Sequence, residues 1–486
     1  MTRLLVVLPF VGALMALLPR QAGLRRAVLV AVAALHAAGT LICFIVRPEI
    51  RAGAWLGLDE AGLLVLGISS ALFLAVSIYT VVYLQRQEMP GLHLHEHNEP
   101  ERVFCGCLLA FLGTMTLVTA SRHLGLLWVA MEATTLVSAP LIYFHRTQRS
   151  LEATWKYVLI CSVGIALALL GTVFLAAGIP AHASPADLTM ERLVGSGGMV
   201  QVEWLKISFI CFAVGYGTKV GLAPLHTWLP DAHSEAPSLV SALLSGALLN
   251  CAALGVMRAH QVCVAHGLAA FSQDILMVLG IGSVIVAAIF IIGQSDYKRM
   301  LAYSSVEHMG IVMLGVGLGG GAVSGALLHA VNHSVTKAAL FMAAGTILET
   351  CRSKQVQDVR GLRRRLPWTA GIWLAGFFAI TGTPPFGAFI SEFTIAARAL
   401  ASGRWLISVL YLGGLAAIVA GMARIVIEMT GGVPGQGMAH GRVREPLALV
   451  VPPLVLLGVT LVLGVYVPAG LWEFLQRAAA ALGGGQ

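Results

Sequence analysis

Four ionisable side chains lie inside long apolar stretches of this 486-residue sequence. They are Glu132, Lys219, Lys337 and Glu392, the last near the end of its stretch. In a membrane helix, each such charge costs about 2.5–3.5 kcal/mol at the bilayer centre on insertion scales. A buried pair that only locks two helices together is one interpretation of Glu132 and Lys219. Four separate charges indicate instead a path for ions.

Pairing of Glu132 with Lys219 would give these charges a mechanism. Burial disfavours the charged form of each group, and a nearby opposite charge restores it. Moving the two groups apart would therefore release or admit a proton. The work required is about 2.3 kcal/mol for one charge moved against 100 mV. Contact between the two side chains is a hypothesis.

A second set of polar residues follows a helical spacing. His329, His333 and Lys337 are four residues apart, so all three share one face of a helix. We expect a buried proton relay that leads to Lys337. Polar packing is one alternative. Metal binding by the two histidines is another, which the sequence disfavours because no HExxH glutamate and no third ligand accompany them.

Two polar segments lie beside apolar runs. LHTWLPDAHSEAP at 225–237 clusters Asp231, His233 and Glu235, and we interpret it as the mouth of a half-channel, with an interfacial loop as the alternative. In DYKRMLAYSSVEHMG at 296–310, Lys298 is a path residue or an interfacial anchor.

The amino-acid composition indicates which class of protein contains these residues. Hydrophobic residues make up 58% of the chain and charged residues 11%, against about a quarter charged in soluble domains. Mean hydropathy is +0.85. An ordinary cytosolic enzyme, a disordered protein and a secreted disulfide scaffold are therefore excluded.

The apolar residues come in runs of about 20, long enough for membrane-spanning helices, and lipid leaves unpaired backbone groups no other partner. The predicted fold class is an all-α polytopic membrane protein with about 14 transmembrane helices. The runs lie near 4–19, 27–46, 62–84, 103–120, 124–144, 156–179, 205–225, 238–260, 274–293, 300–318, 322–348, 369–390, 403–429 and 446–468. The first run is expected to be a retained helix rather than a signal peptide, because no clear cleavage site follows it.

Two of these runs contain glycine and proline beside a charge. GYGTKVGLAP at 215–224 holds Lys219, and GTPPFGAFISEF at 382–393 holds Glu392. Their odd separation of five runs implies opposite orientations, so we expect inverted repeats with ion sites at two broken helices. The predicted helix-break residues are Gly217, Gly221, Pro224, Pro384 and Pro385.

This reasoning divides the chain into four parts. Residues 1–102 hold helices 1–3 and a loop, 103–260 a first repeat, 274–429 a second repeat, and 430–486 a flexible loop, the last helix and a short tail. The stretches 85–102, 181–204 and 430–446 are expected to be loops, the first with His93, His95 and His97 in solvent.

The net charge of +8 reflects membrane orientation rather than nucleic-acid binding, because basic patches interleaved with aromatics are absent from the sequence. Basic residues concentrate in one set of connecting segments, as in the run Arg363, Arg364 and Arg365, and are sparser on the other side, where Arg258 is counted. The denser side is expected to be cytoplasmic, which places both termini on the non-cytoplasmic side.

No cofactor, metal or redox centre is expected on this chain. The eight cysteines are scattered without a CxxC pair, and are interpreted as packing residues. Gly315, Gly317 and Gly320 match a dinucleotide-binding pattern, but they follow an apolar helix rather than a strand.

Several long motifs also resemble a known family. They are LWVAME at 127–132, GTKVGLAPLHTWLPDAHSEAP at 217–237, DYKRMLAYSSVEHMG at 296–310, HAVNHSVTKAALF at 329–341 and GTPPFGAFISEF at 382–393. They are similar to the antiporter-like subunits of respiratory complex I, of membrane-bound nickel–iron hydrogenases and of multi-subunit sodium/proton antiporters. The resemblance spans roughly 100–430. Within the family, segments 97–115 and 233–252 look most like component F of hydrogenase-4 and formate hydrogenlyase-type complexes.

The resemblance implies fourteen helices with two inverted five-helix repeats. It also implies that Glu132 and Lys219 form the pair of the first half-channel, that His329, His333 and Lys337 belong to a central hydrophilic axis, and that Glu392 is a terminal glutamate. Where related chains often carry a Lys or His, this sequence has Asn250. Asn250 cannot carry a proton, which puts the usual central linker in doubt, although water could bridge there.

The resulting expectation is a proton-translocating subunit of a redox-driven complex in the bacterial inner membrane. Its partners would be other membrane and hydrophilic subunits of a hydrogenase or complex I-like assembly, protons, with sodium as the alternative ion, and the lipid bilayer. One alternative is a subunit of a multi-subunit sodium/proton antiporter or another redox-independent transport complex. The other is a scaffold that does not conduct.

Overall fold

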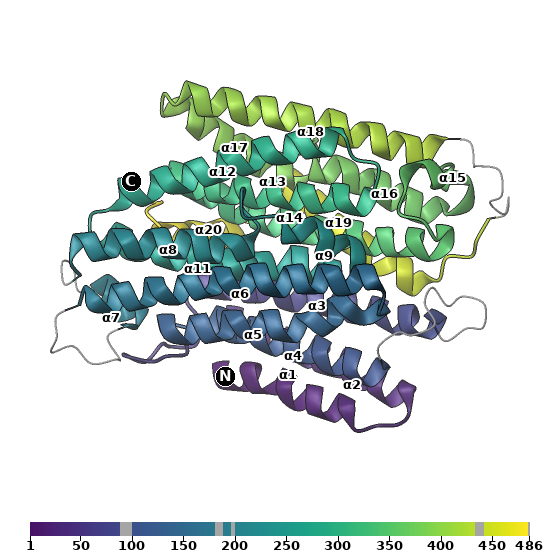
Figure 1. Cartoon of the computed structure of the whole chain (residues 1–486), viewed down its shortest axis with the longest axis horizontal. Helices are drawn as coiled ribbons and strands as arrows, with labels where there is room; N and C mark the ends of the chain where they lie inside the picture. The colour runs from purple at the N-terminus through teal and green to yellow at the C-terminus, as the bar shows by residue number, and fades with distance from the viewer. Residues whose placement is uncertain (88–99, 180–187, 196–199, 433–441, 485–486) are drawn as a thin grey trace.

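The computed structural model describes residues 1–87, 100–179, 188–195, 200–432 and 442–484. Over these residues the secondary structure is helical, and β-structure is limited to three isolated bridges. Figure 1 shows most of the helices lying side by side along the long axis of the molecule. The all-α class is therefore confirmed. His93, His95 and His97 lie outside the described residues, as do parts of the three expected loops.

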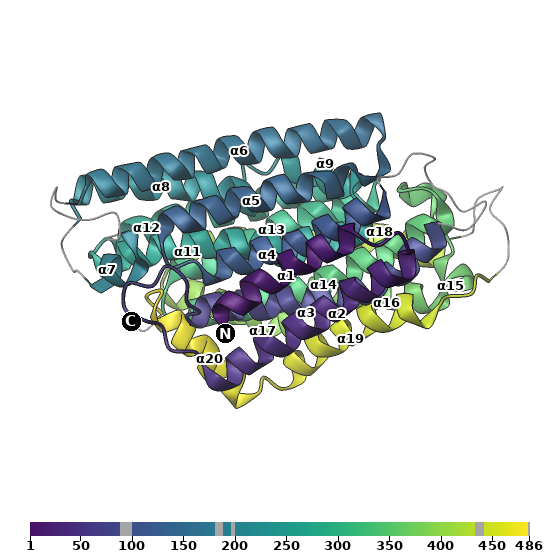
Figure 2. The ribbon, with the colours of Figure 1, turned by 90° about the horizontal axis from the view of Figure 1, so that it is seen from below.

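The helices before the first break form one side of the bundle. α1 and α2 lie at one edge, α6 lies at another, and Figure 2 shows α5 between α6 and α4. Their bounds are α1 Thr2–Leu17, α2 Ala22–Val46, α3 Glu60–Gln87, α4 Glu101–Ala120, α5 Leu124–Ile142, α6 Gln148–Ala177, the short α7 Met190–Gly195 and α8 Val202–Val220.

The middle of the bundle is built from the next helices. Every residue in the most apolar stretches of Ser238–Ala265 and Tyr297–Leu318 is buried, so these helices face other helices rather than lipid. Polar side chains on them must therefore find partners inside the protein. The bounds are α9 Trp228–Glu235, α10 Ser238–Leu243, a π-helical turn Leu244–Leu248, α11 Leu249–Ala265, α12 Ala269–Ile292, α13 Tyr297–Leu318 and α14 Gly321–Cys351.

The remaining helices lie on two sides of the bundle, with α19 and α20 packed against α3. α18 and α17 lie at the edge opposite α1 and α2 in Figure 1. The bounds are α15 Leu362–Arg365, α16 Pro367–Ile380, α17 Gly387–Ala401, α18 Trp405–Gly431, α19 Leu447–Val465 and α20 Ala469–Ala480.

Ten helices are long and apolar enough to cross a membrane, and two shorter apolar helices, Thr2–Leu17 and Pro367–Ile380, accompany them in the described part of the chain. The expected count of about fourteen, the inverted five-helix repeats and the four-part division stay predictions.

Two details differ from the sequence-based expectation. Arg258 is not in a connecting segment: it lies in α11, and its side chain is 2% exposed and paired with Asp59. The run expected to end at 390 stops at Ile380 and resumes as α17 to Ala401, so Glu392 lies within a helix rather than near the end of one. Hydropathy misplaced these boundaries because it does not separate an apolar helix from an apolar break.

Candidate proton path

The first helix break follows Lys219. α8 ends at Val220, and Gly221 takes a left-handed φ of +81°, which favours glycine. The N–H groups of Gly221 and Leu222 both donate to the carbonyl of Gly217 at 3.0 Å. Gly217 therefore lies in the last turn of α8, and the break begins one turn later than the sequence suggested.

Side chains from neighbouring helices satisfy the backbone of this break. Trp228 Nε1 donates to the Thr218 carbonyl at 2.8 Å, and Ser283 Oγ accepts the N–H of Ala223 at 2.9 Å. Pro224, which follows a cis peptide bond, lies in the same segment. Irregular backbone inside a membrane protein requires such partners, so these hydrogen bonds stabilise the break.

Lys219 is buried among hydroxyl groups. Its Nζ donates to Thr135 Oγ1 of α5 and to Tyr157 OH of α6, the latter at 3.1 Å. Ser138 Oγ donates to the Thr134 carbonyl at 2.7 Å, so Tyr157 OH is the donor in its 2.7 Å bond with Ser138. The amine of Lys219 is thus held by acceptors that carry no charge.

Glu132 lies one helical turn before Thr135 on α5 and is half-buried. Its Oε1 accepts a 2.7 Å hydrogen bond from Ser162 of α6, and its Oε2 is buried without a partner among the described residues. Glu132 and Lys219 form no direct ion pair in the described structure, although the charge of Glu132 acts on Lys219. Each side chain is hydrogen-bonded to hydroxyl groups instead, Glu132 to Ser162 and Lys219 to Thr135 and Tyr157.

Asn250 connects the first helices to α14. Its Nδ2 donates to the Gly246 carbonyl and to Ser334 Oγ, both at 2.8 Å. Gly246 belongs to the π-helical turn just before α11, where the backbone departs from α-helical pairing. Asn250 therefore joins α11 to α14. Because its amide cannot carry a proton, water molecules would have to transfer the proton past this position.

α14 presents His329, His333 and Lys337 to α13 and to the π-helical turn, as their spacing predicts. His333 Nε2 lies 3.3 Å from the Ser245 carbonyl, and Lys337 Nζ donates to the Leu301 carbonyl at 2.8 Å. Glu307 of α13 is the carboxylate whose charge acts on Lys337, and its side chain is 3% exposed with Oε2 unpartnered in the described structure.

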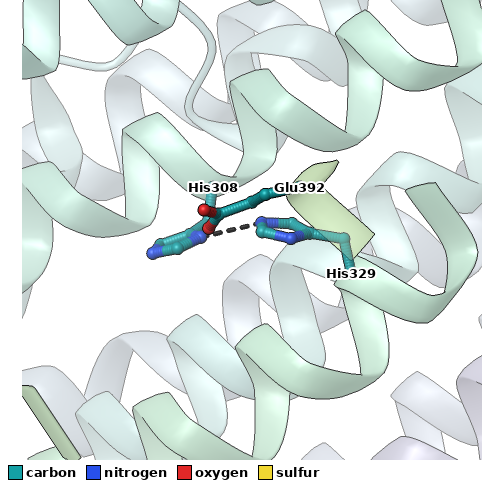
Figure 3. A group of neighbouring side chains, drawn as sticks. All are labelled: His308, His329 and Glu392. Atoms are coloured by element: carbon teal, nitrogen blue, oxygen red, sulfur yellow. Dashed lines mark hydrogen bonds between the residues drawn. The ribbon is translucent and has the colours of Figure 1, made fainter. Parts of the chain in front are cut away.

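The imidazoles of His308 and His329 are joined by a hydrogen bond, drawn in Figure 3. His308 Nδ1 and His329 Nε2 are 2.8 Å apart, and His329 Nδ1 lies 3.0 Å from Ser391 Oγ. Ser391 donates its single hydroxyl proton to the Ala388 carbonyl, so His329 Nδ1 is the donor to Ser391. His329 Nε2 then carries a lone pair, and His308 Nδ1 must donate to it.

This assignment leaves His308 Nε2 as a hydrogen-bond acceptor without a donor. It is buried, has no hydrogen-bond partner in the described structure and lies 3.9 Å from Glu307 Oε2. A proton that arrives at His308 Nε2 can therefore be relayed through Nδ1 to His329, and from His329 Nδ1 to Ser391. For a given set of tautomers, these hydrogen bonds allow a proton to move in one direction only. We call them the proton wire.

Glu392 lies at the second break. α16 ends at Ile380 and α17 begins at Gly387, with Pro384 and Pro385 between them and joined by a cis peptide bond. Helical side chains lean toward the helix N-terminus, so the Glu392 carboxylate reaches back to the break. A Cβ on Gly382, which has a φ of +61°, would collide with Glu392 Oε2. Glycine is thus required there both for its conformation and for the space it leaves.

Lys298 and His233 lie together near a cavity. Lys298 Nζ donates to the carbonyls of Ser234 and Ala236 at 3.2 and 2.7 Å, and it lines a cavity of about 360 Å³. His233 is fully buried, stacks on Phe341 with ring centroids 5.0 Å apart, and has both ring nitrogens unpartnered in the described structure. Charges on Lys298 and Lys337 both act on His233, so its imidazole lies within electrostatic range of both lysines.

A second cavity of about 420 Å³ opens beside the first. Its lining includes Asp231, Glu235 and Asp296, together with Arg299 and Lys354. Asp231 and Glu235 belong to the segment that was expected to form a mouth, Asp296 and Arg299 to the N-terminal end of α13, and Lys354 follows α14. The cavities show that polar, hollowed surface leads to Lys298; that it conducts stays a prediction.

Reasoning from the sequence missed several buried polar residues, among them Glu307, His308 and the buried position of Arg258. Glu307 and His308 lie inside the apolar run 300–318, where a charge in an otherwise apolar helix was the available signal. Arg258 pairs with Asp59 at 3.0 Å, and Arg122 joins them at 3.1 Å. Burial raises the pKa of Asp59, but the guanidinium groups of Arg258 and Arg122 outweigh burial, and the pKa lies below its usual value.

Comparisons with known proteins agree with this arrangement. The sequence profile of the NADH:quinone oxidoreductase/Mrp antiporter transmembrane family matches residues 121–417, which is more than half of the chain. The chain belongs to this family. The matched segment holds the two breaks and all the candidate path residues.

Individual relatives extend the likeness over the chain. The chain is 34% identical over 411 residues to a hydrogenase-4 component F homolog of Methylacidiphilum infernorum, covering 84% of this chain and 85% of the relative. A chain of respiratory complex I from Thermus thermophilus superposes with a TM-score of 0.81 at 26% identity, covering all of both chains. A chain of an archaeal membrane-bound sulfane sulfur reductase shares the fold, with a TM-score of 0.87 at 22% identity and coverage of 99% and 97%.

Proposed function

We propose that this antiporter-like subunit conducts protons across the membrane within a hydrogenase-4 or complex I-type complex. The observation that supports it best is a set of buried or half-buried ionisable and polar side chains on α5, α8, α9, α11, α13, α14 and α17. The members are Glu132, Lys219, Asn250, His233, Lys298, His333, Lys337, Glu307, His308, His329 and Glu392.

Each half of the set can exchange a proton by a different step. In the first half, a change in the distance between Glu132 and Lys219 alters which of the two holds a charge. In the second half, the proton moves along the imidazoles of His308 and His329. Asn250 and Ser334 lie between the halves, and we propose that water completes the connection there.

Membership of larger assemblies is proposed from the relatives. The relative from Methylacidiphilum is named as a hydrogenase-4 component, and the Thermus chain is part of respiratory complex I. This chain would then couple to other membrane subunits and to a hydrophilic redox arm in the bacterial inner membrane, with both termini on the non-cytoplasmic side. Protons are the proposed ion, and sodium is the alternative.

Proton uptake by the intact complex in liposomes tests the conduction. Lys219→Ala is expected to abolish uptake while the complex still assembles. Lys206→Ala is the matched control, because Lys206 lies on the same helix with its side chain 38% exposed. Unchanged uptake in Lys219→Ala, with assembly intact, would overturn the role of this lysine and favour a scaffold.

The partners are tested by purifying the tagged chain gently from its native membrane and identifying what accompanies it by mass spectrometry. Nickel–iron hydrogenase and iron–sulfur subunits would support the hydrogenase proposal, and NADH-oxidising subunits would move the chain to complex I. Transport subunits without a redox protein would favour a sodium/proton antiporter.

A further inference from the structure

Three side chains from different helices converge beside the proton wire. His308 of α13, His329 of α14 and Glu392 of α17 each offer one ligand atom, and the three atoms lie within 4.8 Å of one another. All three residues are buried. Figure 3 shows the carboxylate of Glu392 next to the hydrogen bond between the two rings.

The donor set suits a zinc ion. Two imidazole nitrogens with one carboxylate oxygen is a known Zn²⁺ combination, which leaves a fourth position for water. Two nitrogens bound to one tetrahedral Zn²⁺ at about 2.0–2.1 Å are about 3.3 Å apart. The two rings are 2.8 Å apart at their hydrogen-bonded nitrogens, so they need to separate by about 0.5 Å and to tilt, because both nitrogens must turn from each other toward the ion.

The surrounding groups orient the two rings for this role. A histidine that binds a metal usually donates its other ring N–H to a neighbouring acceptor. Ser391 Oγ already accepts from His329 Nδ1 at 3.0 Å, which leaves His329 Nε2 free for the ion. The Oε2 of Glu307 lies 3.9 Å from His308 Nε2, and an approach of about 1 Å would let it accept a hydrogen bond from the Nε2–H of a His308 ring bound through Nδ1.

Two carboxylates near the site oppose the charge of the ion. A divalent ion in the bundle interior needs opposing charge, since an isolated buried charge is strongly disfavoured. Glu392 would bind the ion directly, and Glu307 would face it through His308. His333, whose ring centroid lies 5.1 Å from that of His308, is held toward the Ser245 carbonyl and is not part of the set.

We propose that His308, His329 and Glu392 form a zinc-binding site, and that the bound ion blocks the proton wire by replacing the proton shared between His308 and His329. No electron is transferred. The proton on His308 Nδ1 moves to Nε2 of the same ring, and the lone pairs at His308 Nδ1, His329 Nε2 and the carboxylate bind the ion. The block rests on the proposed proton path, whereas the binding does not.

Zinc affinity of the purified complex tests the binding. The complex that contains this chain is titrated with Zn²⁺ against a chromophoric chelator, and with Co²⁺ to record the absorption bands of a tetrahedral nitrogen and oxygen site. His308→Gln and Glu392→Gln are each expected to weaken zinc binding by more than about 100-fold. Ser391→Ala is expected to weaken it about 10-fold, because the loss of an orienting partner usually lowers affinity 10- to 100-fold.

The matched control is His36→Gln. His36 is equally buried but is held by Ser70 and Thr116 at 2.9 and 3.0 Å, away from this cluster. Its substitution is expected to leave zinc affinity unchanged. Equal affinity in the wild type, His308→Gln and Glu392→Gln would overturn the site. If His308→Gln fails to assemble, Glu392→Gln, which keeps the size of the side chain, decides alone.

Proton uptake then separates the two parts of the proposal. Zinc at concentrations that fill the site is expected to inhibit uptake by the wild-type complex, with recovery after chelation. Tight binding with no inhibition would overturn the block but keep the site. Absence of uptake from a zinc-free, fully assembled complex would overturn the proposed function, while the affinity measurement would still report on the site.

Discussion

The two halves of the candidate path, one around Lys219 and one around His329, stabilise their buried ionisable groups with different side chains. Around Lys219, hydroxyl groups of Thr135 and Tyr157 accept from the amine. Around His329, an imidazole, His308, and a hydroxyl, Ser391, complete the hydrogen bonds. The first half therefore surrounds a charged group with neutral acceptors, whereas the second joins groups that can each take up a proton.

The difference has a chemical consequence. A hydroxyl can relay a proton but does not hold it as a charge near neutral pH, whereas an imidazole can do both. The first half is thus suited to controlling when a proton passes between Glu132 and Lys219. The second half is suited to storing and delivering protons along a chain of bonds.

The two breaks differ in a related way. At the first, Lys219 lies at the C-terminal end of α8, where the helix dipole favours a cation. At the second, the Glu392 carboxylate is brought back against Gly382 in the break itself. The first break therefore positions Lys219 at the end of a helix. The second positions the Glu392 carboxylate in the space that Gly382 leaves.

The strongest test of this comparison is Glu307→Gln in the second half. Glu307 is the carboxylate that acts on Lys337, and it faces His308 Nε2. We expect proton uptake to fall by about 100-fold, the lower end of what a positioned proton-transfer group contributes. Liposome assays of the assembled complex measure this. Glu428→Gln, at a half-exposed pair with Arg360, is the control, and equal uptake in the two variants would remove Glu307 from the path.

Tyr157→Phe tests the role of the hydroxyl groups that surround Lys219 in the first half. The ring packs against Trp228 with centroids 5.0 Å apart, so the substitution keeps the packing and removes only the oxygen. A hydrogen bond to a charged group contributes about 1.5–3 kcal/mol. We expect uptake to fall roughly 10-fold. A loss as large as that of Glu307→Gln would mean that the Tyr157 hydroxyl does more than hold the amine of Lys219.

The paired variants Gly221→Ala and Gly382→Ala compare the breaks. Both glycines have positive φ, so each alanine should cost about 1–2 kcal/mol of folding free energy, measured by thermal unfolding in detergent. At Gly221 the new Cβ meets the end of the Leu229 side chain, but at Gly382 it meets the Glu392 carboxylate. Uptake per folded complex should therefore fall only in Gly382→Ala. Equal uptake in both would show that the position of Glu392 at the break is unimportant.

The smallest effect is expected for Ser138→Ala. Ser138 accepts from Tyr157 at 2.7 Å but has no contact with Lys219 in the described structure. A neutral hydrogen bond contributes about 1 kcal/mol, so uptake should fall by no more than about 5-fold. A loss as large as that of Tyr157→Phe would mean that the whole hydroxyl network, rather than the contact with Lys219, controls the first half.

Much of the site could be predicted because membrane helices make charged residues conspicuous. Glu132, Lys219, Lys337 and Glu392 were found from their apolar surroundings, and the helical spacing of His329 and His333 correctly placed them on one face. Glu307 and His308 were overlooked, although the same signal was present in their helix. The break near Gly221 was predicted to within one turn from glycine and proline.

By itself, the sequence determined that this protein is a helical membrane protein, where its helices are interrupted and which charges they bury. These follow from local properties: apolar length, backbone restrictions of glycine and proline, and the energetic cost of charge in lipid. Only the tertiary structure decided that hydroxyl groups hold the amine of Lys219, that His308 is hydrogen-bonded to His329, and that Glu392 lies close to both histidines. Those contacts join helices distant in the chain, and a one-dimensional pattern holds no information on which faces of such helices meet.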